Sequence, residues 1–429
     1  MQNGEKMSLV FDWILLIIGS IFSIASYKKI IFKKNVSIAN YIILVVYIFC
    51  ILPVLLNYLI GIPQYKTVYW YKVFINPMEN NKVTIIYDTY ILFTIILLYI
   101  YSKKVNPNFK NSNLTYLSIF ENKIISWLLI LSPLILILIT GTLKNYFVFN
   151  IASNRGLSEN DATGLISPLL LLSVFTFFCK FYKKNISIKK ILLSLLYFFA
   201  IIWISGKRFM IANLILLLVY YICSSEISIK IRKKIFFIAP ISLIALISFS
   251  AIYLTKIRPL SDTSMSSVYE MLRVDFGRDD VIKYVIDKEI LNDNKILDYR
   301  GQTIISMFLF WIPRRIWPNK PYPHYRYLTA SILSLPINNL PAGTTPSWFE
   351  MCICNFGILG FFIAPILLLL FCKLTDSGSS IDIKAIGLML ITVLLTQCMD
   401  VYIIYIVILI FIKFISIVFK NKKIKIIWR

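Results

Sequence analysis

Residues 8–26, "SLVFDWILLIIGSIFSIAS", contain a single charged side chain, Asp12, among apolar and small residues. A helix of this length matches the apolar core of a bilayer, which needs about 20 residues of low polarity. Similar runs recur along the chain, which is 58% hydrophobic, only 15% charged and has a mean hydropathy of +0.76. This composition excludes a soluble globular protein and predicts an all-α membrane protein that crosses the bilayer many times.

The number of such runs sets the expected architecture. We predict about eleven transmembrane helices, within a range of roughly ten to fourteen. The runs 191–205 and 385–399 are shorter than the ~17 residues that a full crossing usually needs, so the count depends on them. The predicted spans are 8–26, 37–60, 84–101, 124–141, 164–180, 191–205, 209–224, 235–254, 347–372, 385–399 and 401–419.

Lysine and arginine residues gather in every second connection between these spans. The connection after the first span, for example, holds Lys28, Lys29, Lys33 and Lys34. Cytoplasmic connections carry such an excess, so this side is the cytoplasm and the N-terminus lies outside. The net charge of +24 therefore mostly reflects topology, and nucleic-acid binding is the weaker interpretation.

On this topology the chain has three parts. They are an N-terminal bundle of about eight helices (1–254), one large external loop (255–346) and C-terminal transmembrane helices (347–429). Long loops are usually functional. Within the loop, residues 266–291 mix both charge signs with apolar residues at helical spacing, which predicts a small amphipathic cap on the membrane surface.

Five cations follow in the second part of the external loop, with no acid between Asp298 and Glu350. An Arg or Lys at the bilayer centre costs about 2.5–3.5 kcal/mol, so the apolar stretch 304–313 does not carry the group across. We expect that stretch to be interfacial and the cations to remain at the membrane surface. The five cations are Arg300, Arg314, Arg315, Lys320 and Arg326.

Four of these cations, all except Arg300, lie in "FLFWIPRRIWPNKPYPHYRY", residues 308–327, which also holds His324, the chain's only histidine. Guanidinium groups bind phosphate through paired hydrogen bonds, and a proline-rich backbone stays extended. The stretch therefore favours binding of an anion with several oxygens. The alternative is that the side chains snorkel to ordinary lipid phosphates.

Two further motifs adjoin the membrane. In "AGTTPSWFE", residues 342–350, Thr345 and Pro346 fit the start of a helix, and Ser347 with Glu350 fits a capping box. Glu350 is therefore either a capping or a catalytic residue. In "GKR", residues 206–208, Lys207 and Arg208 either snorkel from a turn or take part in function.

Several of these segments together resemble a known family. The quoted "FWIPRRIWPNKP", the run Gly343–Glu350 with Asn355, Gly357 and Gly360, and "ISGKRF" at 204–209 are similar to the oligosaccharide repeat-unit polymerases, the Wzy-type O-antigen and capsule polymerases of bacteria. The motifs cover a small part of the chain, and the rest of the likeness is one of topology.

The resemblance implies a fold of the C-type glycosyltransferase kind in the bacterial cytoplasmic membrane, with the active site facing the exterior. It implies undecaprenyl-diphosphate-linked oligosaccharide as both donor and acceptor, and membrane lipids as surroundings. The growing glycan would pass to the non-reducing end of a new lipid-linked repeat unit. A chain-length regulator and a flippase are further implied partners, and no cofactor is expected.

This chemistry assigns roles to the charged residues. Departure of a lipid diphosphate needs cations, and attack by a sugar hydroxyl needs a base. We favour His324 as the base, because an imidazole near cations stays neutral at pH 7; the other candidates are Asp279, Asp280 and Glu350. No metal site is predicted. The expected diphosphate-binding residues are Arg314, Arg315, Lys320, Arg326, Lys207, Arg208, Arg273 and Arg278.

Other functions use similar substrates. A surface polysaccharide ligase would share the lipid-diphosphate donor. A lipid-linked oligosaccharide flippase usually places ionisable groups within its helices and often shows an internal repeat, neither of which is prominent here. A dolichol-type mannosyltransferase is disfavoured, because the first large external connection, 62–83, holds only Glu79 as an acid.

Overall fold

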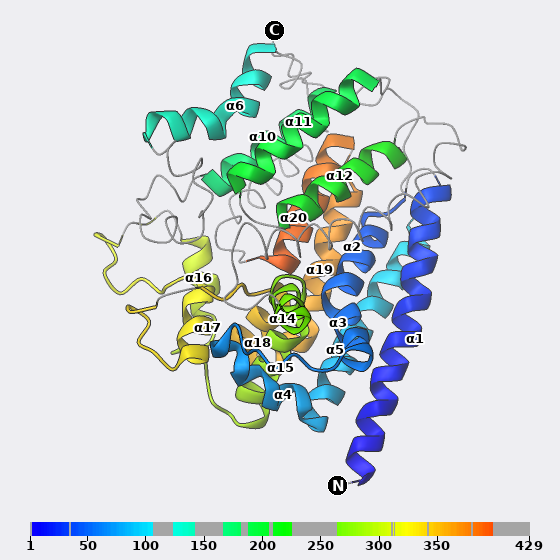
Figure 1. Cartoon of the computed structure of the whole chain (residues 1–429), viewed down its shortest axis with the longest axis vertical. Coiled ribbons are helices and arrows are strands. Elements are labelled where there is room, and N and C mark those ends of the chain that lie inside the picture. The colour runs from blue at the N-terminus through cyan, green and yellow to red at the C-terminus, as the bar shows by residue number, and fades with distance from the viewer. Residues whose placement is uncertain are drawn as a thin grey trace, which may run out of the picture.

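The computed structural model describes the chain in several stretches, and regular structure within them is entirely helical, without strands (Figure 1). The all-α expectation is therefore confirmed for these residues. The described residues are 2–33, 36–105, 123–141, 166–181, 188–205, 209–224, 264–309, 312, 314–340, 343–378 and 381–397.

Four helical runs are long and apolar enough to cross a membrane, as expected of a multi-pass membrane protein. The first is α1 (Gln2–Phe32). The second joins α2 (Ile38–Val46), the π-helical turn η1 (Tyr47–Ile51) and α3 (Leu52–Leu59). The third is α5 (Asn81–Lys104), and the fourth joins α18 (Trp348–Phe356), η5 (Gly357–Leu359) and α19 (Gly360–Asp376).

Shorter apolar helices account for the other predicted spans that fall on described residues. The helix α6 packs on α10, and α12 packs on α20. The predicted spans 235–254 and 401–419 lie outside the described residues. The shorter helices are α6 (Lys123–Ile139), α10 (Ile166–Phe181), α11 (Ile188–Ser205), α12 (Phe209–Ser224) and α20 (Ile381–Thr396).

A proline explains how the second long run joins the rest of the molecule. Pro53 has no N–H, so the carbonyl of Phe49, four residues earlier, loses its helical donor. The backbone N–H of Arg278, from the expected external loop, donates to that oxygen at 3.0 Å. The next carbonyl, that of Cys50, accepts the hydroxyl of Tyr87 at 2.6 Å. A distant segment thus completes the middle of this helical run.

The expected external loop forms short helices beside a second group of short helices. Figure 1 shows α4 and α15 at the end of the bundle where α1 begins. The helices of residues 264–340 are α14 (Met265–Phe276), α15 (Asp279–Ile286), the π-helical turn η4 (Asp287–Leu291), α16 (Gln302–Phe308) and α17 (His324–Leu333). The second group is η2 (Tyr69–Phe74) and α4 (Ile75–Glu79).

The prediction of an amphipathic cap was right about helices and wrong about the position of α15. Every residue of α15 is buried, and the helix packs against α5 and α18 instead of lying on a surface. Its charged side chains have partners inside the protein: Asp279 pairs with Arg273, and Lys283 donates to Thr84. Because these groups are paired, they do not hold the helix in solvent.

The start and end of α18 rest on specific side chains. Ser347 is the N-cap, and the predicted capping box with Glu350 is present, but the helix begins at Trp348 and not at Pro346. At the other end Gly357 has φ +60°, a left-handed backbone that favours glycine. Arg300 donates to the last carbonyls of α18, including that of Cys354 at 2.7 Å.

Candidate functional site

The predicted site residues fall into two separate groups, and the first is a buried corner between α14 and α15. Arg273 donates from Nη1 to Asp279 Oδ1 at 3.0 Å and from Nη2 to Asp279 Oδ2 at 2.8 Å. The two side chains are 2% and 0% exposed. A bidentate pair of this kind satisfies the charge on both partners. Arg273 is therefore held by an internal carboxylate, although we predicted it as a diphosphate ligand.

The second carboxylate of the corner, Asp280, is bound by a loop that the sequence did not single out. The hydroxyl of Tyr65 donates to Asp280 Oδ2 at 2.7 Å. Burial, followed by the charge of Asp279, raises the pKa of Asp280, while this hydrogen bond opposes the rise. Tyr65 is fully buried and has φ +46°, an unusual backbone for a non-glycine residue. Asp280 is thus a fixed structural acceptor in this state.

Glu270 holds the same loop from α14. Its carboxylate accepts the backbone N–H groups of Lys66 and Thr67 at 2.9 and 3.0 Å and the Thr67 hydroxyl at 2.5 Å. The carboxylate is an acceptor that three donors satisfy. The acid therefore fixes residues 66–67, which follow Tyr65. Sequence reasoning missed Glu270 because its partners lie about two hundred positions away in the chain.

Arg278 occupies the turn between α14 and α15. The residue is 3% exposed, and its guanidinium donates to the carbonyls of Gly277 and Thr396, the latter at 2.9 Å at the end of α20. The guanidinium carbon lies 5.8 Å from the ring centroid of Phe49. These contacts tie three distant segments together. Arg278, like Arg273, serves the fold, and neither side chain reaches the surface.

Glu350 and His324 are also buried, with no exposed surface. Glu350 makes the capping box with Ser347, so the capping interpretation is confirmed and a catalytic role stays a prediction. His324 is the first residue of α17, and burial lowers its pKa to about 3. Burial, and not the nearby cations that we expected, keeps the imidazole neutral at pH 7, and the same burial makes it a weak base.

The second group is a cation cluster around Tyr322, which we define as Arg314, Lys320 and Arg326. The guanidinium carbons of Arg314 and Arg326 lie 3.9 and 4.9 Å from the ring centroid of Tyr322. Burial and, to a smaller extent, the positive charge of Arg314 lower the pKa of Lys320, so these two cations lie near each other. Three of the predicted diphosphate ligands thus lie together.

Backbone carbonyls of the loop help to hold Arg314 and Lys320 in place. Arg314 donates to the backbone carbonyls of Lys320 and Pro321 at 2.6 and 3.2 Å, and Lys320 Nζ donates to the carbonyl of Ile312 at 3.0 Å. The hydroxyl of Tyr322 donates to Asn338 Oδ1 at 2.7 Å, which fixes the ring. Tyr322 was not among the predicted site residues, although an aromatic residue between Pro321 and Pro323 and next to several cations could have indicated a cation–π contact.

The side chains of the cation cluster are more exposed than those of the buried corner. Arg314 is exposed, and Arg326 is half-buried. The two ion pairs within the described ranges, Arg273–Asp279 and Arg300–Glu289, do not include them. Cations near one another without a carboxylate attract an anion with several oxygens. The arrangement can therefore bind a phosphate or diphosphate group.

The remaining predicted ligands lie apart from this cluster or outside the described residues. Arg315 is exposed beside Arg314 in the sequence and has no place at the Tyr322 ring. Lys207 and Arg208 fall outside the described residues. Arg300, which we counted among the five cations, is instead paired with Glu289 at 2.5 Å. Within the described ranges no three His, Cys, Asp or Glu side chains gather as a metal site would require.

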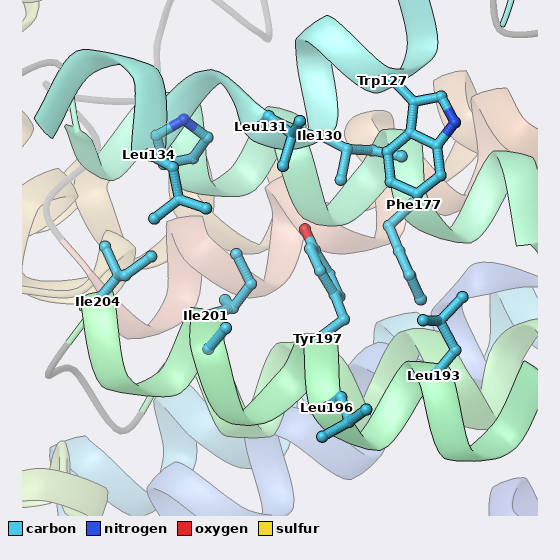
Figure 2. Close-up of a pocket in the computed structure, with 12 residues that line it drawn as sticks. Trp127, Ile130, Leu131, Leu134, Phe177, Leu193, Leu196, Tyr197, Ile201 and Ile204 are labelled. Carbon is cyan, nitrogen blue, oxygen red and sulfur yellow. The ribbon is translucent and has the colours of Figure 1, made fainter. Parts of the chain in front are cut away.

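A separate pocket of about 160 Å³ lies between α6, α10 and α11 (Figure 2). Trp127, Phe177 and Tyr197 line it together with aliphatic side chains, and none of its lining residues is charged. The Tyr197 hydroxyl is shared with Ser173 at 2.6 Å. The pocket offers apolar contact only, in a part of the molecule other than the cation cluster.

We compared the chain with models of protein families, with curated proteins and with solved structures, and none of the three comparisons gave a match.

Proposed function

We propose that the protein is a membrane glycosyltransferase that polymerises lipid-linked oligosaccharide repeat units at the outer face of the bacterial cytoplasmic membrane. It would transfer a growing glycan from undecaprenyl diphosphate to the non-reducing end of a new lipid-linked unit. The proposal includes the finer architecture of about eleven transmembrane helices in a C-type glycosyltransferase-like fold. The motifs that resemble the repeat-unit polymerases motivate it.

One structural observation supports the proposal: the cations around Tyr322 lie together with Arg314 exposed and Lys320 and Arg326 half-buried, and residues 299–349 of their segment contain no acid. A lipid diphosphate is an anion with several oxygens whose lipid tail stays in the membrane. Apolar side chains of the same segment, Phe308 and Ile316, are 56% and 76% exposed, which suits a position at the membrane surface. Cations beside apolar surface match both halves of that substrate.

The chemistry assigns each group a step. As the bond between the anomeric carbon and the diphosphate oxygen breaks, negative charge develops on the leaving group, and Arg314 and Arg326 stabilise it. The hydroxyl oxygen of the acceptor sugar forms the new bond to that carbon, and its proton passes to a base. His324 remains the predicted base, and the proposal requires substrate binding to uncover its imidazole.

The direct test combines binding and turnover by the purified protein in lipid nanodiscs. Lipid-linked repeat units extracted from source cells lacking the protein should yield dimers and trimers of the unit by mass spectrometry. The double variant Arg314→Ala/Arg326→Ala should bind undecaprenyl diphosphate more weakly by at least about a hundredfold, since each hydrogen bond to a charged group contributes about 1.5–3 kcal/mol. It should give no ladder of products.

The matched control is Lys295→Ala, which removes an exposed cation from the same external segment without touching the cluster. Its binding and product ladder should equal those of the unaltered protein. Equal binding by the double variant would remove the cation cluster from the site. A chelator added to the reaction should leave the ladder unchanged.

The same experiment separates the other two functions. A ligase would release glycan from the lipid only when its final acceptor is added, and would leave single units unjoined. A flippase would move lipid-linked units across a vesicle membrane and form no new glycosidic bond. Dimers made from lipid-linked units alone would therefore exclude both.

A further inference from the structure

Two carboxyl groups meet inside the bundle, away from the cation cluster. Asp12 of α1 and Asp88 of α5 are 8% and 1% exposed and lie within electrostatic reach of each other, where α1 packs along α5 and the Ser8 hydroxyl donates to Asn81 Oδ1 at 2.7 Å. Asp12 Oδ2 accepts the hydroxyl of Tyr58 at 2.6 Å. Asp12 Oδ1 and both oxygens of Asp88 are buried without a donor among the described residues. Ionised carboxylates only accept hydrogen bonds, so neither acid can donate a hydrogen bond to the other. Two buried negative charges side by side therefore need a positive charge near them.

One cation approaches this pair from the expected external loop. Lys283 of α15 is 3% exposed, donates to Thr84 Oγ1 at 3.3 Å and lies 5.2 Å from the ring centroid of Tyr87. Its ammonium attracts Asp88 electrostatically. Two carboxylates and one ammonium leave the group one positive charge short, and a buried net charge is unfavourable.

The neighbouring elements do not supply the missing charge. Asp279 of α15 also acts on Asp88, but Arg273 balances its charge through the bidentate pair. Tyr58 of α3 is a neutral donor to Asp12. A metal cation would be repelled by the ammonium of Lys283. A proton needs no coordination shell and turns one carboxylate into the donor that the other lacks.

We propose that Asp12 and Asp88 share one bound proton, so that the group formed with Lys283 is electrically neutral and joins α1 and α5 to α15. This proton site stands independently of the proposed glycosyltransferase activity, because it uses none of the cations around Tyr322. It would make the attachment of the external loop to the membrane helices depend on proton concentration.

Infrared spectroscopy tests the proton directly. At pH 7 the difference spectrum between the unaltered protein and Asp88→Asn should show the loss of one carbonyl band of a protonated carboxylic acid. The same loss is expected for Asp12→Asn, because either substitution leaves a single carboxylate to balance Lys283. Glu79→Gln, which alters an exposed carboxylate near the start of α5, should cause no such loss. If neither Asn variant removes a band, both acids are ionised and the proposal is wrong.

Stability against pH gives a second, independent readout. An exposed aspartate titrates near pH 3.9, so above about pH 5 the unfolded chain has lost a proton that the folded protein keeps. The unfolding equilibrium constant should then rise about tenfold per pH unit relative to Asp88→Asn, which has no proton to lose. Parallel pH profiles for the two proteins would contradict the proposal.

The double variant Asp12→Asn/Asp88→Asn checks the charge balance. It leaves Lys283 unbalanced and should unfold at a lower temperature than either single variant. Adding Lys283→Met should restore the loss. The contrary result is a protein that is more stable in sodium chloride than in choline chloride at the same ionic strength, with the difference lost in Asp88→Asn. That result would show that the acids bind a sodium ion and not a proton, and it would overturn the proposal.

Discussion

The buried corner of Arg273 and Asp279 and the exposed cluster around Tyr322 contain the same kinds of side chain and behave in opposite ways. In the corner every arginine has an internal acceptor, whether the carboxylate of Asp279 or the carbonyl of Thr396. In the cluster Arg314 binds loop carbonyls and an aromatic ring. The difference lies in burial: Arg273 and Arg278 are 2% and 3% exposed on acceptors within the protein, whereas Arg314 is exposed.

The largest expected effect comes from breaking the buried pair. Asp279→Ala should lower the free energy of unfolding by about 3–5 kcal/mol, because it leaves Arg273 charged and without its partner. Thermal unfolding in detergent measures the loss. The exposed Asp298→Ala, on the same segment, should change stability little. Replacing both partners, as in Arg273→Met/Asp279→Leu, should recover much of the lost stability. If the Asp279→Ala protein were fully stable, the buried pair would contribute as little to stability as the exposed cations do.

His324 should give the next largest effect, through pH. An unfolded histidine titrates near pH 6.5, whereas the buried one has a pKa of about 3. Below pH 6.5 the unfolded chain gains a proton that the folded protein does not, so stability is present above that pH and is lost as pH falls toward 3. The loss by pH 5 should be on the order of 2 kcal/mol. Unfolding temperatures of the unaltered protein and His324→Leu, compared from pH 7 to 5, should diverge; parallel curves would show that the imidazole is exposed.

Tyr65→Phe should lower the free energy of unfolding by a similar or smaller amount, about 1–2 kcal/mol, since it removes one hydrogen bond and leaves an oxygen of buried Asp280 without its donor. Denaturant unfolding provides the measurement. Tyr69→Phe is the matched control, because Tyr69 is 68% exposed in the same part of the chain. Equal stability of the two variants would mean that the loop does not depend on Asp280.

The smallest effect on stability is expected in the cluster itself. Arg314→Ala removes a cation from the ring of Tyr322, an interaction of about 0.5–1 kcal/mol at an exposed site. Its unfolding temperature should therefore stay close to that of the unaltered protein, while its affinity for undecaprenyl diphosphate falls. A large loss of stability with unchanged affinity would reverse the contrast between the two regions.

The sequence predicted those features that depend on local patterns. Apolar runs gave the helices, and the spacing of Ser347 and Glu350 gave the capping box, because both follow from residues within a few positions. The depth of α15 could not be predicted, since it depends on partners such as Thr84 and Phe49 that are remote in the chain. Charge counting likewise placed Arg300 among the five cations expected at the membrane surface, although it binds Glu289 and the end of α18.

Local reading also recovered part of the candidate site. It identified Arg314, Lys320 and Arg326 from their density and the missing acids, and the structure brings them together. It could not show that Tyr322 is the ring they share, because a tyrosine among prolines has many possible orientations. The buried acids were selected by residue type alone, and burial, which decides their availability, is a property of the folded chain.

The missing N–H of Pro53 has a consequence for how the molecule opens. Because the amide of Arg278 fills the gap at Phe49, that amide is closed inside the bundle although Arg278 is remote from Phe49 in the chain. Its hydrogen should exchange with solvent deuterium as slowly as the amides of the long helices, and at the same rate as its neighbours in α15. The loop and the membrane helices would then open as one cooperative unit, and no separate lid would exist at this corner.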